Sequence, residues 1–303
     1  MKSTSDFHYH SIEKDWRLRR HMSTTPESTV LKIENVSAED SSPAGGLISI
    51  WTVNRPNKLN ALNAEVNAAI KSACAWAESN DDVRVVVVTG ASPEAPPEGK
   101  RAKPNSFVAG ADISEFEGMS SVEIRPIFDD NVWEYVWNLS KPTIAMVDGF
   151  ALGGGSEIAL SCDLRIATAR SNFGTPEINL GLIPGGGGTQ RLCRLLGYGR
   201  AMEMVMSGEM VNGEEAHRIG LVNHLVQPDE LRAKTMEIAQ GLASKSPHTI
   251  RIAKAAVRAA LENPFSAGIL AERDLFCALF DTEDMAIGVK AFLNREKAEW
   301  TGA

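Results

Sequence analysis

Two glutamates and a run of glycines are the residues in this sequence best suited to carry out chemistry. Three glycines (153–155) follow an apolar run at 143–147, and Glu157 comes next, at the start of a segment with helical spacing. Glu177 lies 20 residues further on, in a turn bounded by glycine and proline. Paired carboxylates can act as general base and general acid, and the N–H groups of a helix start can stabilise negative charge. The stretch 143–190 therefore predicts an active site.

A glycine cluster also suggests a nucleotide-binding loop, but the pattern departs from the known ones. GxGxxG fails because Ile158 stands where the third glycine belongs, and GxxxxGK[ST] does not occur. Glu157 in the first helical turn would repel a phosphate. Glu177 has the spacing of a ribose-binding acid, yet it follows Gly174 and Pro176 instead of ending an apolar strand. These departures disfavour a dinucleotide fold.

Simpler interpretations exist for each polar residue of the stretch taken alone. Ser156 suggests a hydrolase nucleophile, but Glu157 and Ile158 follow it, so GxSxG is absent. A lone glutamate in a first helical turn stabilises the helix dipole by about 0.3–1 kcal/mol. Glu177 alone is most simply a loop carboxylate in water. Neither glutamate is diagnostic by itself.

Composition and charge limit the class of protein. With 303 residues, 43% hydrophobic and 23% charged, the chain is typical of a globular protein with one large domain or a domain and a subdomain. The net charge of −8 disfavours nucleic-acid binding, and no apolar run reaches the ~18 residues of a membrane span. The separated cysteines favour reduced thiols in the cytoplasm over disulfides or a metal site: Cys74, Cys162, Cys193 and Cys277.

The elements that must position the two glutamates alternate between strand and helix. The segments 30–36 and 47–53 predict a hairpin, and 83–90 predicts a strand buried on both faces. Between 47–53 and 83–90, the apolar residues of 62–79 predict an amphipathic helix. The segment 91–106, after the buried strand, is rich in proline and charge and predicts a surface loop. The inner face of the helix is predicted to consist of Leu62, Val66, Ile70, Ala73 and Ala77.

Helices dominate the second half of the chain. One is predicted over 122–140, with Ile124, Phe128, Val132, Tyr135, Val136 and Leu139 inward. The segment 164–173 offers one or two short strands, and nearly everything after Gly187 is predicted helical. Near 250–262 the predicted inner face is Ile250, Ala253, Val257 and Leu261, and the outer face Arg251, Lys254, Arg258 and Glu262. The order predicts an α/β fold with a helical C-terminal third.

Both ends of the sequence lack an evident targeting signal. The segment 1–28 is polar, and acids lie beside its basic cluster, which predicts a flexible tail instead of an organelle transit peptide. The last three residues, 301–303, differ from an SKL-type peroxisomal signal. We therefore expect a cytoplasmic location.

Five segments together resemble the enoyl-CoA hydratase (crotonase) family, over roughly residues 30–300. They occur in the family's order: NRPNKLNALN (54–63), FVAGADISE (107–115), KPTIAMVDGFALGGGSEIALSCD (141–163), FGTPEINLGLIPGGGGTQRL (173–192) and FDTEDMAIGVKAF (280–292). The resemblance implies a spiral of ββα units followed by C-terminal helices that assemble homotrimers, often paired as homohexamers. We accordingly expect a tail at 1–28, a spiral core with the active site at 29–225, and a C-terminal helical region for trimerisation at 226–303.

The resemblance also implies an activity, that of a hydro-lyase of fatty acid metabolism. Water would add reversibly and syn to a 2-trans-enoyl-CoA, giving a 3-hydroxyacyl-CoA, with no cofactor because coenzyme A is part of the substrate. The backbone N–H groups of Ala111 and Gly154 would form an oxyanion hole for the thioester oxygen. Glu157 would hold and deprotonate the water, and Glu177 would deliver the proton to Cα.

Further residues match substrate-binding positions of the family. The contacts implied for the acyl-CoA are Lys58, Ala61, Ala109, Asp112, Ile113 and Gly153. Lys58 could pair with a phosphate or simply be a solvated lysine, and both interpretations stay open. Candidates for the acyl pocket, which could equally be core residues, are Phe116, Met119, Trp133 and Leu182. The chain departs from the family at Ser156 (commonly Cys), at Thr175 (frequently Gln) and in the longer 91–106 loop.

Other functions are compatible with the same scaffold. An enoyl-CoA isomerase, a thioester hydrolase or a decarboxylase would use it differently, and an isomerase typically needs only the later carboxylate, so the pair favours hydration. Some relatives bind RNA through a lysine-rich helix. The corresponding helix here carries Lys71 with Glu65 and Glu78, so the basic comb is missing. No nucleic-acid or membrane partner is expected.

Overall fold

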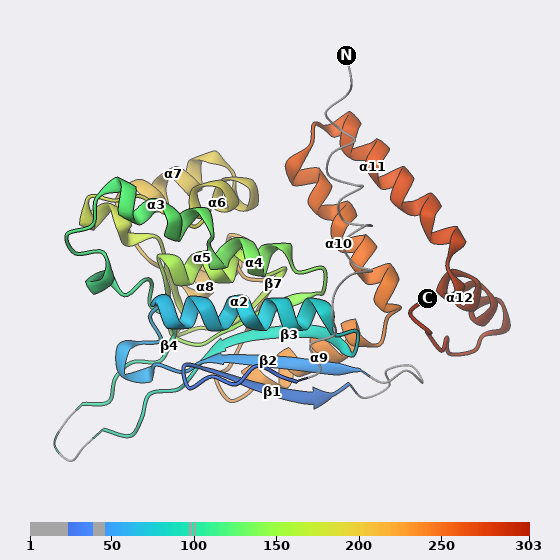
Figure 1. The fold of residues 1–303 in the computed structure, drawn as a ribbon, viewed down its shortest axis with the longest axis horizontal. Helices are drawn as coiled ribbons and strands as arrows, with labels where there is room; N and C mark the ends of the chain where they lie inside the picture. Colours follow the sequence, from blue (N-terminus) through green and yellow to red (C-terminus); the bar gives the residue numbers. More distant parts are fainter. Residues whose placement is uncertain (1–23, 39–45, 97–98, 100) are drawn as a thin grey trace.

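Two β-sheets lie at the centre of the computed structural model, which describes residues 24–38, 46–96, 99 and 101–303 (Figure 1). The larger sheet has the order β1-β2-β3-β5-β7-β10 and the smaller β4-β6-β8-β9. The larger comprises β1 (Leu31–Ser37), β2 (Leu47–Val53), β3 (Val83–Gly90), β5 (Thr143–Val147), β7 (Leu164–Thr168) and β10 (His224–Val226). The smaller comprises β4 (Ser106–Val108), β6 (Phe150–Leu152), β8 (Asn172–Gly174) and β9 (Val211–Asn212).

The predicted hairpin and central strand are confirmed. β1 and β2 pair antiparallel, with Leu31 opposite Val53, while the turn predicted between them falls mostly outside the described residues. β3 pairs in parallel with β2 and β5, and its residues 83–88 are all buried. A strand with neighbours on both edges and cover on both faces needs the continuous β-branched run that the sequence shows.

Successive units of the chain repeat one path. A strand of the larger sheet is followed by a strand of the smaller sheet and then by one or two helices: β3-β4-α3-α4, β5-β6-α5 and β7-β8-α6. The helices of these units are α3 (Ser121–Asp129), α4 (Val132–Asn138), α5 (Gly154–Ser161) and α6 (Gly188–Leu196). This is the crotonase-like spiral of ββα units that the resemblance implied.

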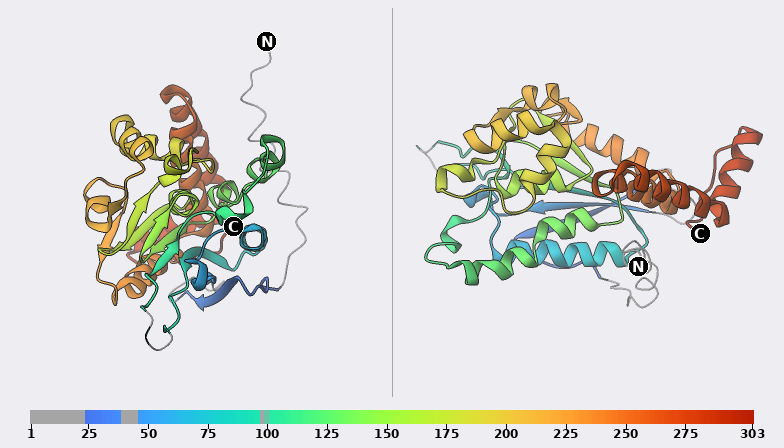
Figure 2. Two further views of the ribbon diagram at one scale, coloured as in Figure 1. Left: turned by 90° about the vertical axis from the view of Figure 1, so that its left-hand side faces the viewer. Right: turned by 90° about the horizontal axis from the view of Figure 1, so that it is seen from above.

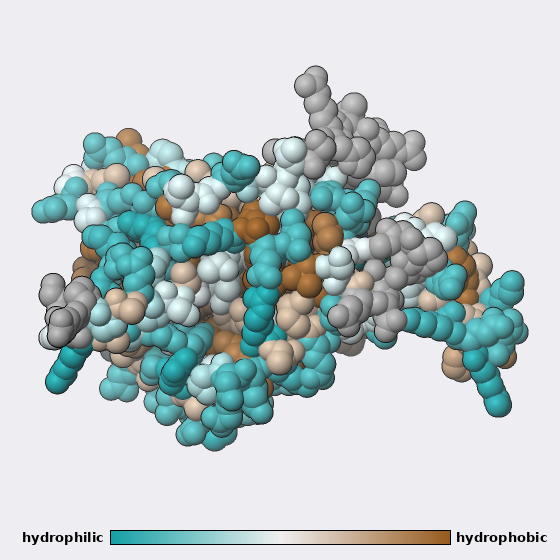
Figure 3. Space-filling model, turned by 90° about the horizontal axis from the view of Figure 1, so that it is seen from below, coloured by the Kyte–Doolittle hydropathy of each residue, from teal (hydrophilic) through white to brown (hydrophobic). Residues whose placement is uncertain are grey.

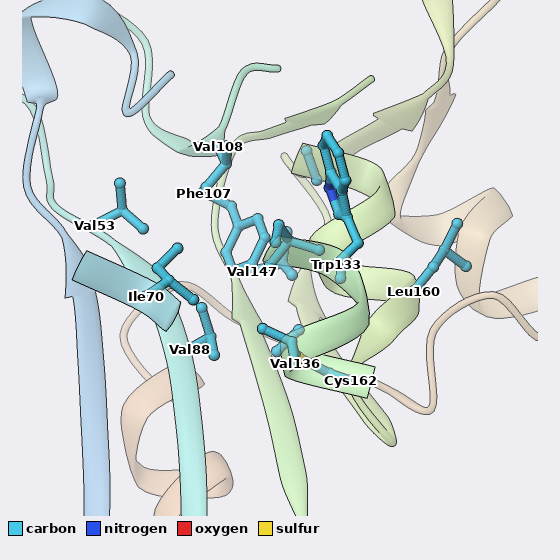
Figure 4. Close-up of a cluster of buried hydrophobic side chains, with 14 of the residues drawn as sticks. Val53, Ile70, Val88, Phe107, Val108, Trp133, Val136, Val147, Leu160 and Cys162 are labelled. Carbon is cyan, nitrogen blue, oxygen red and sulfur yellow. The ribbon is translucent and has the colours of Figure 1, made fainter. Parts of the chain in front are cut away.

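The helix α2 (Ala64–Ser79) covers one face of the larger sheet, as predicted. The residues predicted to face inward are all buried, although Leu62 precedes the helix: Leu62, Val66, Ile70, Ala73 and Ala77. The side chain of Asn63 caps the helix by accepting a hydrogen bond from the N–H of Val66. Figure 4 shows side chains from β2, α2, β3, β4 and α4 meeting in this core.

The single helix predicted over 122–140 is wrong, because the chain forms α3 and α4 with a break between them. Asn131 has extended backbone angles, and its side chain accepts from the N–H of Glu134, which starts a new helix at Val132. This capping side chain satisfies a donor at the break and competes with continuation of α3. One residue predicted inward, Tyr135, is exposed.

After α6 the chain is less uniformly helical than predicted, because β9 adds a strand to the smaller sheet and β10 adds one to the larger sheet. The helices are α7 (Tyr198–Ser207), α8 (Gly213–Arg218) and α9 (Leu231–Ala243). α9 packs on the face of the larger sheet, where Leu231, Ala239 and Ala243 join a second hydrophobic cluster. The sequence assigned α9 to the C-terminal region, and the division at 225/226 stays a prediction.

The last helices extend away from the sheets (Figures 1 and 2). They are α10 (Pro247–Glu262), α11 (Phe265–Ala278) and α12 (Glu283–Asn294). The faces predicted for α10 are wrong: Lys254 and Arg258 pair with Asp163 at 2.7 and 3.0 Å, whereas Val257 is 71% exposed. The carboxylate of Asp163 at the edge of the core attracts both cations, so the polar side of α10 packs inward.

Short 3-10 helices complete the description. They are η2 (Pro56–Lys58), η3 (Ile113–Glu115), η4 (Pro176–Leu180) and η5 (Leu279–Asp281). Among the described residues, no helix is both long and apolar enough to cross a membrane.

Candidate active site

Glu157 is a buried carboxylate held by two backbone N–H groups. It lies in the first turn of α5 and is only 2% exposed. Its Oε1 accepts hydrogen bonds from the N–H of Gly186 at 2.8 Å and of Gly188 at 2.7 Å. Burial raises its pKa to about 7; the negative charge of Glu177 adds to this rise, and the two N–H groups oppose it. The result is a fixed carboxyl group that can exchange a proton near neutral pH.

The glycine loop that holds Glu157 has a function that the sequence analysis missed. Gly187 has φ +97°, a left-handed conformation that glycine adopts without strain. A Cβ on Gly188 would lie 3.0 Å from Glu157 Oε1, so a side chain there would crowd the carboxylate. The signal was present in the run of four glycines at 185–188, which begins a helix as the run at 153–155 does.

Glu177, by contrast, has one oxygen without a hydrogen-bond partner among the described residues. It lies in η4, directly after β8, and its Oε1 is 2.9 Å from the position that a Cβ on Gly153 would occupy. Gly153 itself has φ +51°. Glu177 Oε2 is buried and accepts no hydrogen bond from the described residues. Burial raises the pKa of this carboxyl, which favours its protonated form.

The N–H groups of Ala111 and Gly154 come close to each other although 43 residues separate them. A Cβ on Gly154 would lie 3.6 Å from the nitrogen of Ala111. Ala111 forms an isolated β-bridge with Leu62, and two hydrogen bonds hold its segment: Leu62 N–H donates to Gly110 O at 2.8 Å, and Asp112 N–H donates to Leu62 O at 2.7 Å. Neither the Ala111 nor the Gly154 N–H donates to another described residue. Both are therefore available to a ligand oxygen.

An aromatic side chain connects the two glycine segments. Trp133 of α4 donates from Nε1 to the carbonyl of Gly154 at 2.8 Å, and its ring packs so closely on Gly186 that a Cβ there would overlap it. It stacks on Phe128 with the centroids 5.7 Å apart. Trp133, one of the acyl-pocket candidates, thus lies against both parts of the site. Two other candidates, Met119 and Leu182, are exposed.

The residues expected to contact coenzyme A lie around η2 and in the segment around Ala111. Lys58 is exposed at the end of η2. The N–H of Ala109 donates to the carbonyl of Leu59, the residue after Lys58, at 3.1 Å. Asp112 is engaged elsewhere: hydrogen bonds from Ser114 and Arg55, at 2.7 and 3.0 Å, lower its pKa. Because both carboxylate oxygens accept these hydrogen bonds, Asp112 holds the segment around Ala111 in place through its side chain.

The remaining expected contacts flank this loop. Ala61 is half-buried beside η2, and Ile113, at the start of η3, is exposed. Lys103, which the sequence analysis did not single out, donates to Asn57 O at 2.7 Å from the 91–106 loop. Two lysines therefore lie at one turn, on adjoining segments. Within the described part of the chain, no group of His, Cys, Asp or Glu side chains is arranged to hold a metal ion.

Comparisons with known proteins agree over most of the chain. The sequence model of the enoyl-CoA hydratase/isomerase family matches residues 44–303. The short-chain-enoyl-CoA hydratase of Clostridium acetobutylicum is 40% identical over 256 residues, which cover 84% of this chain and 94% of that protein. The crotonyl-CoA hydratase of Syntrophomonas wolfei is 38% identical over 255 residues, with the same two coverages.

Solved structures are similar over the same extent. An enoyl-CoA hydratase subunit I from Geobacillus kaustophilus has a TM-score of 0.81 and 36% identity, and covers 92% of this chain and 100% of that one. The enoyl-CoA hydratase of Bacillus anthracis has a TM-score of 0.80 and 30% identity, and covers 90% and 100%.

Proposed function

The chain belongs to the enoyl-CoA hydratase/isomerase family and is a hydro-lyase, and we propose that it adds water reversibly and syn to short 2-trans-enoyl-CoA thioesters. The relatives named for short-chain and crotonyl substrates support crotonyl-CoA as the compound to test. Coenzyme A is then part of the substrate, and we propose that no further cofactor takes part. The observation that carries the proposal is the buried Glu157, fixed by two N–H groups within electrostatic range of Glu177.

The first chemical requirement is to stabilise charge on the thioester. Attack of water at C3 pushes an electron pair onto the carbonyl oxygen, which becomes an enolate oxygen. The paired N–H groups of Ala111 and Gly154 are suited to bind it, and the Gly154 N–H also lies at the positive end of α5. Removal of one such donor typically costs about 10²–10³ in rate.

The second requirement is to move two protons. Glu157 takes a proton from the attacking water; its Oε1 is occupied by the loop N–H groups, so Oε2 is the basic atom. Glu177, whose raised pKa favours the acid form, gives its proton to C2. Dehydration of the 3-hydroxyacyl-CoA uses the same groups in reverse. A base with a pKa of about 7 is well matched to reaction near neutral pH.

Substitution of each glutamate tests this mechanism. Glu157→Gln and Glu177→Gln should each lower kcat for crotonyl-CoA hydration by roughly 10²–10⁴. Glu203→Gln, at an exposed glutamate of α7, is the matched control and should keep wild-type kinetics. Near-wild-type turnover by either site variant would refute the two-carboxylate mechanism. Product analysis with 3-enoyl-CoA tests the isomerase alternative, which needs one carboxylate only.

The C-terminal helices support a proposal about assembly. Large apolar side chains are exposed along them: Val257, Phe265, Leu270, Phe276, Phe280, Phe292 and Leu293. In Figure 3, the end of the molecule where these helices lie shows a few hydrophobic patches among mostly hydrophilic residues. Large apolar side chains exposed on several successive helices are typical of an association site. We propose that residues 226–303 assemble a homotrimer, or a homohexamer of paired trimers, around the 29–225 core.

The test of assembly compares two equally exposed valines. Val257→Glu on α10 should dissociate the oligomer in sedimentation velocity, because it puts a charge into the proposed interface. Val122→Glu on α3, where the residue is 79% exposed, should leave the mass unchanged. A wild-type protein that sediments as a monomer would overturn the proposal. The free cysteines, two of which are buried, support the further proposal of a cytoplasmic location.

A further inference from the structure

Arg191 contacts the glycine loop at 186–188 that holds Glu157. It lies on the first turns of α6, and its Nη1 donates to the carbonyl of Gly186 at 2.7 Å. Gly186 also gives its N–H to Glu157, and Gly188 gives the second N–H. The arginine is therefore bonded to the chain between the two donors.

The guanidinium also fills the space beside Gly187. A Cβ on Gly187 would overlap Nη1, and the φ of +97° excludes most other residues from this position. The loop thus turns directly against the cation. Loss of the guanidinium removes the donor to Gly186 O and the group that packs against Gly187.

The position is unfavourable for an arginine, which suggests that it has a function. A cation near a helix N-terminus opposes the helix dipole, and burial lowers the pKa of Arg191. The negative charges of Glu157 and Glu134 offset part of this cost, and the ring of Trp137, 4.9 Å from the guanidinium carbon, adds a cation–π contact.

The same ring links Arg191 to α10. The guanidinium of Arg258 lies 4.1 Å from the centroid of Trp137 and pairs with Asp163 at 3.0 Å. Asp163 in turn accepts hydrogen bonds from the backbone and side chain of Thr143 on β5. A continuous series of contacts therefore runs from the core strand and α10 to the loop around Glu157.

We propose that Arg191 is a positioning residue, which clamps the 186–188 loop so that its two N–H groups stay directed at Glu157, and that Trp137, against whose ring Arg258 also packs, holds Arg191 in place. The inference rests on the proposed role of Glu157 as the base. It assigns to α10 an effect on the reaction beyond assembly.

Loss of the clamp has a defined direction. The charged groups that act on Glu157 are Glu177 and Arg191, and those that act on Arg191 are Glu157, Glu134 and Arg258. Removing the cation and loosening the N–H groups both disfavour the carboxylate, so the pKa of Glu157 rises above about 7. The base is then protonated over a wider range, and the rising limb of the pH–rate profile moves to higher pH.

The experiment compares three arginine variants. Arg191→Met keeps the apolar stem without the charge, Arg191→Lys keeps the charge without the fork, and Arg194→Met is the control. Arg194 lies on the same helix and donates to a backbone carbonyl, that of Leu261 at 3.1 Å, away from the site. Each variant is assayed for kcat and KM of crotonyl-CoA hydration between pH 5 and 9. The Glu157 carboxyl is titrated by infrared spectroscopy, with Glu157→Gln identifying its band.

The expected result is a shift of the rising limb in Arg191→Met by about one pH unit, with about tenfold lower kcat below the limb, partial recovery at high pH and unchanged KM. Arg191→Lys should lie in between, and Arg194→Met should match the wild type. Arg258→Met should shift the limb in the same direction by less, and it replaces Arg191→Met if that variant does not fold.

An unchanged limb and an unchanged carboxyl titration in Arg191→Met, whatever its activity, would overturn the proposal. The infrared titration needs no turnover. If the wild type does not hydrate enoyl thioesters, the proposed function fails, while the titration still decides whether Arg191 controls Glu157.

Discussion

The two glutamates of the site are held in opposite ways. Glu157 is 2% exposed, and one oxygen accepts two N–H groups from a glycine loop. Glu177 lies in a short 3-10 helix, with a buried oxygen that accepts no hydrogen bond from the described residues. The adjacent Thr175 hydroxyl is likewise buried without such a partner. One carboxyl is thus held by two loop N–H groups, whereas the other has an oxygen with no hydrogen-bond partner among the described residues.

The difference suits the two proposed roles. A base that binds water must hold it at a set distance from C3, and preorganisation of this kind contributes to the rate. An acid that reaches C2 only after the substrate is bound gains from a side chain whose position the protein does not fully set. If this comparison is correct, changes at Glu157 and in the helix that carries it should affect the reaction rate and the stability more than changes at Glu177.

Among the tests of this comparison, the largest effect is expected from the N–H of Gly154, the first residue of the helix that carries Glu157. Gly154→Pro removes this donor at the first helical position, where proline is tolerated. Gly154→Ala adds the same Cβ beside Trp133 and keeps the N–H. We expect kcat of the proline variant to be about 10²–10³ below that of the alanine variant. Equal rates would show that this donor does not stabilise the enolate.

A smaller effect concerns stability. The pKa of Glu157 is about 7 in the folded protein and near 4.5 otherwise, so between these values the folded state binds a proton that the unfolded chain has released. Stability therefore falls as the pH rises through this window, by up to about 3 kcal/mol. Glu157→Gln should raise the free energy of unfolding by up to about 3 kcal/mol at pH 8. At pH 4.5 it should change the free energy of unfolding very little.

The matched comparison is Glu177→Gln, whose parent carboxyl is more exposed. Urea unfolding of both variants at pH 8 and 4.5, at equal protein concentration, should show the smaller gain for Glu177→Gln. A larger gain for Glu177→Gln would contradict the assignment of Glu157 as the more buried charge.

The smallest effect is a shift in the pH profile. The negative charge of Glu177 raises the pKa of Glu157, so its removal should lower that pKa. In the residual activity of Glu177→Gln, the rising limb should move to lower pH by less than about one unit. Infrared titration of the Glu157 carboxyl gives an independent measure. A shift to higher pH would mean that the two carboxyls are not coupled by charge.

Part of the fold followed from local patterns. The continuous run in β3 and the inner face of α2 were predicted correctly, because burial on both faces or on one helical stripe selects residue types at a fixed period. The glutamate pair was singled out because its spacing and glycine neighbours recur in a recognisable set of segments. The break at Asn131 was missed because one capping side chain outweighed a helical period that continued across it.

The sequence by itself determined the class of fold, the candidate chemistry and the residues that could carry it. The tertiary structure decided which groups act on Glu157, because its N–H donors lie 29 and 31 residues away and become neighbours only when α6 packs on α5. It also decided which face of α10 turns inward. Helical periodicity separates polar from apolar faces, but the partner of each face is set by what the rest of the chain presents. Here that partner is the carboxylate of Asp163.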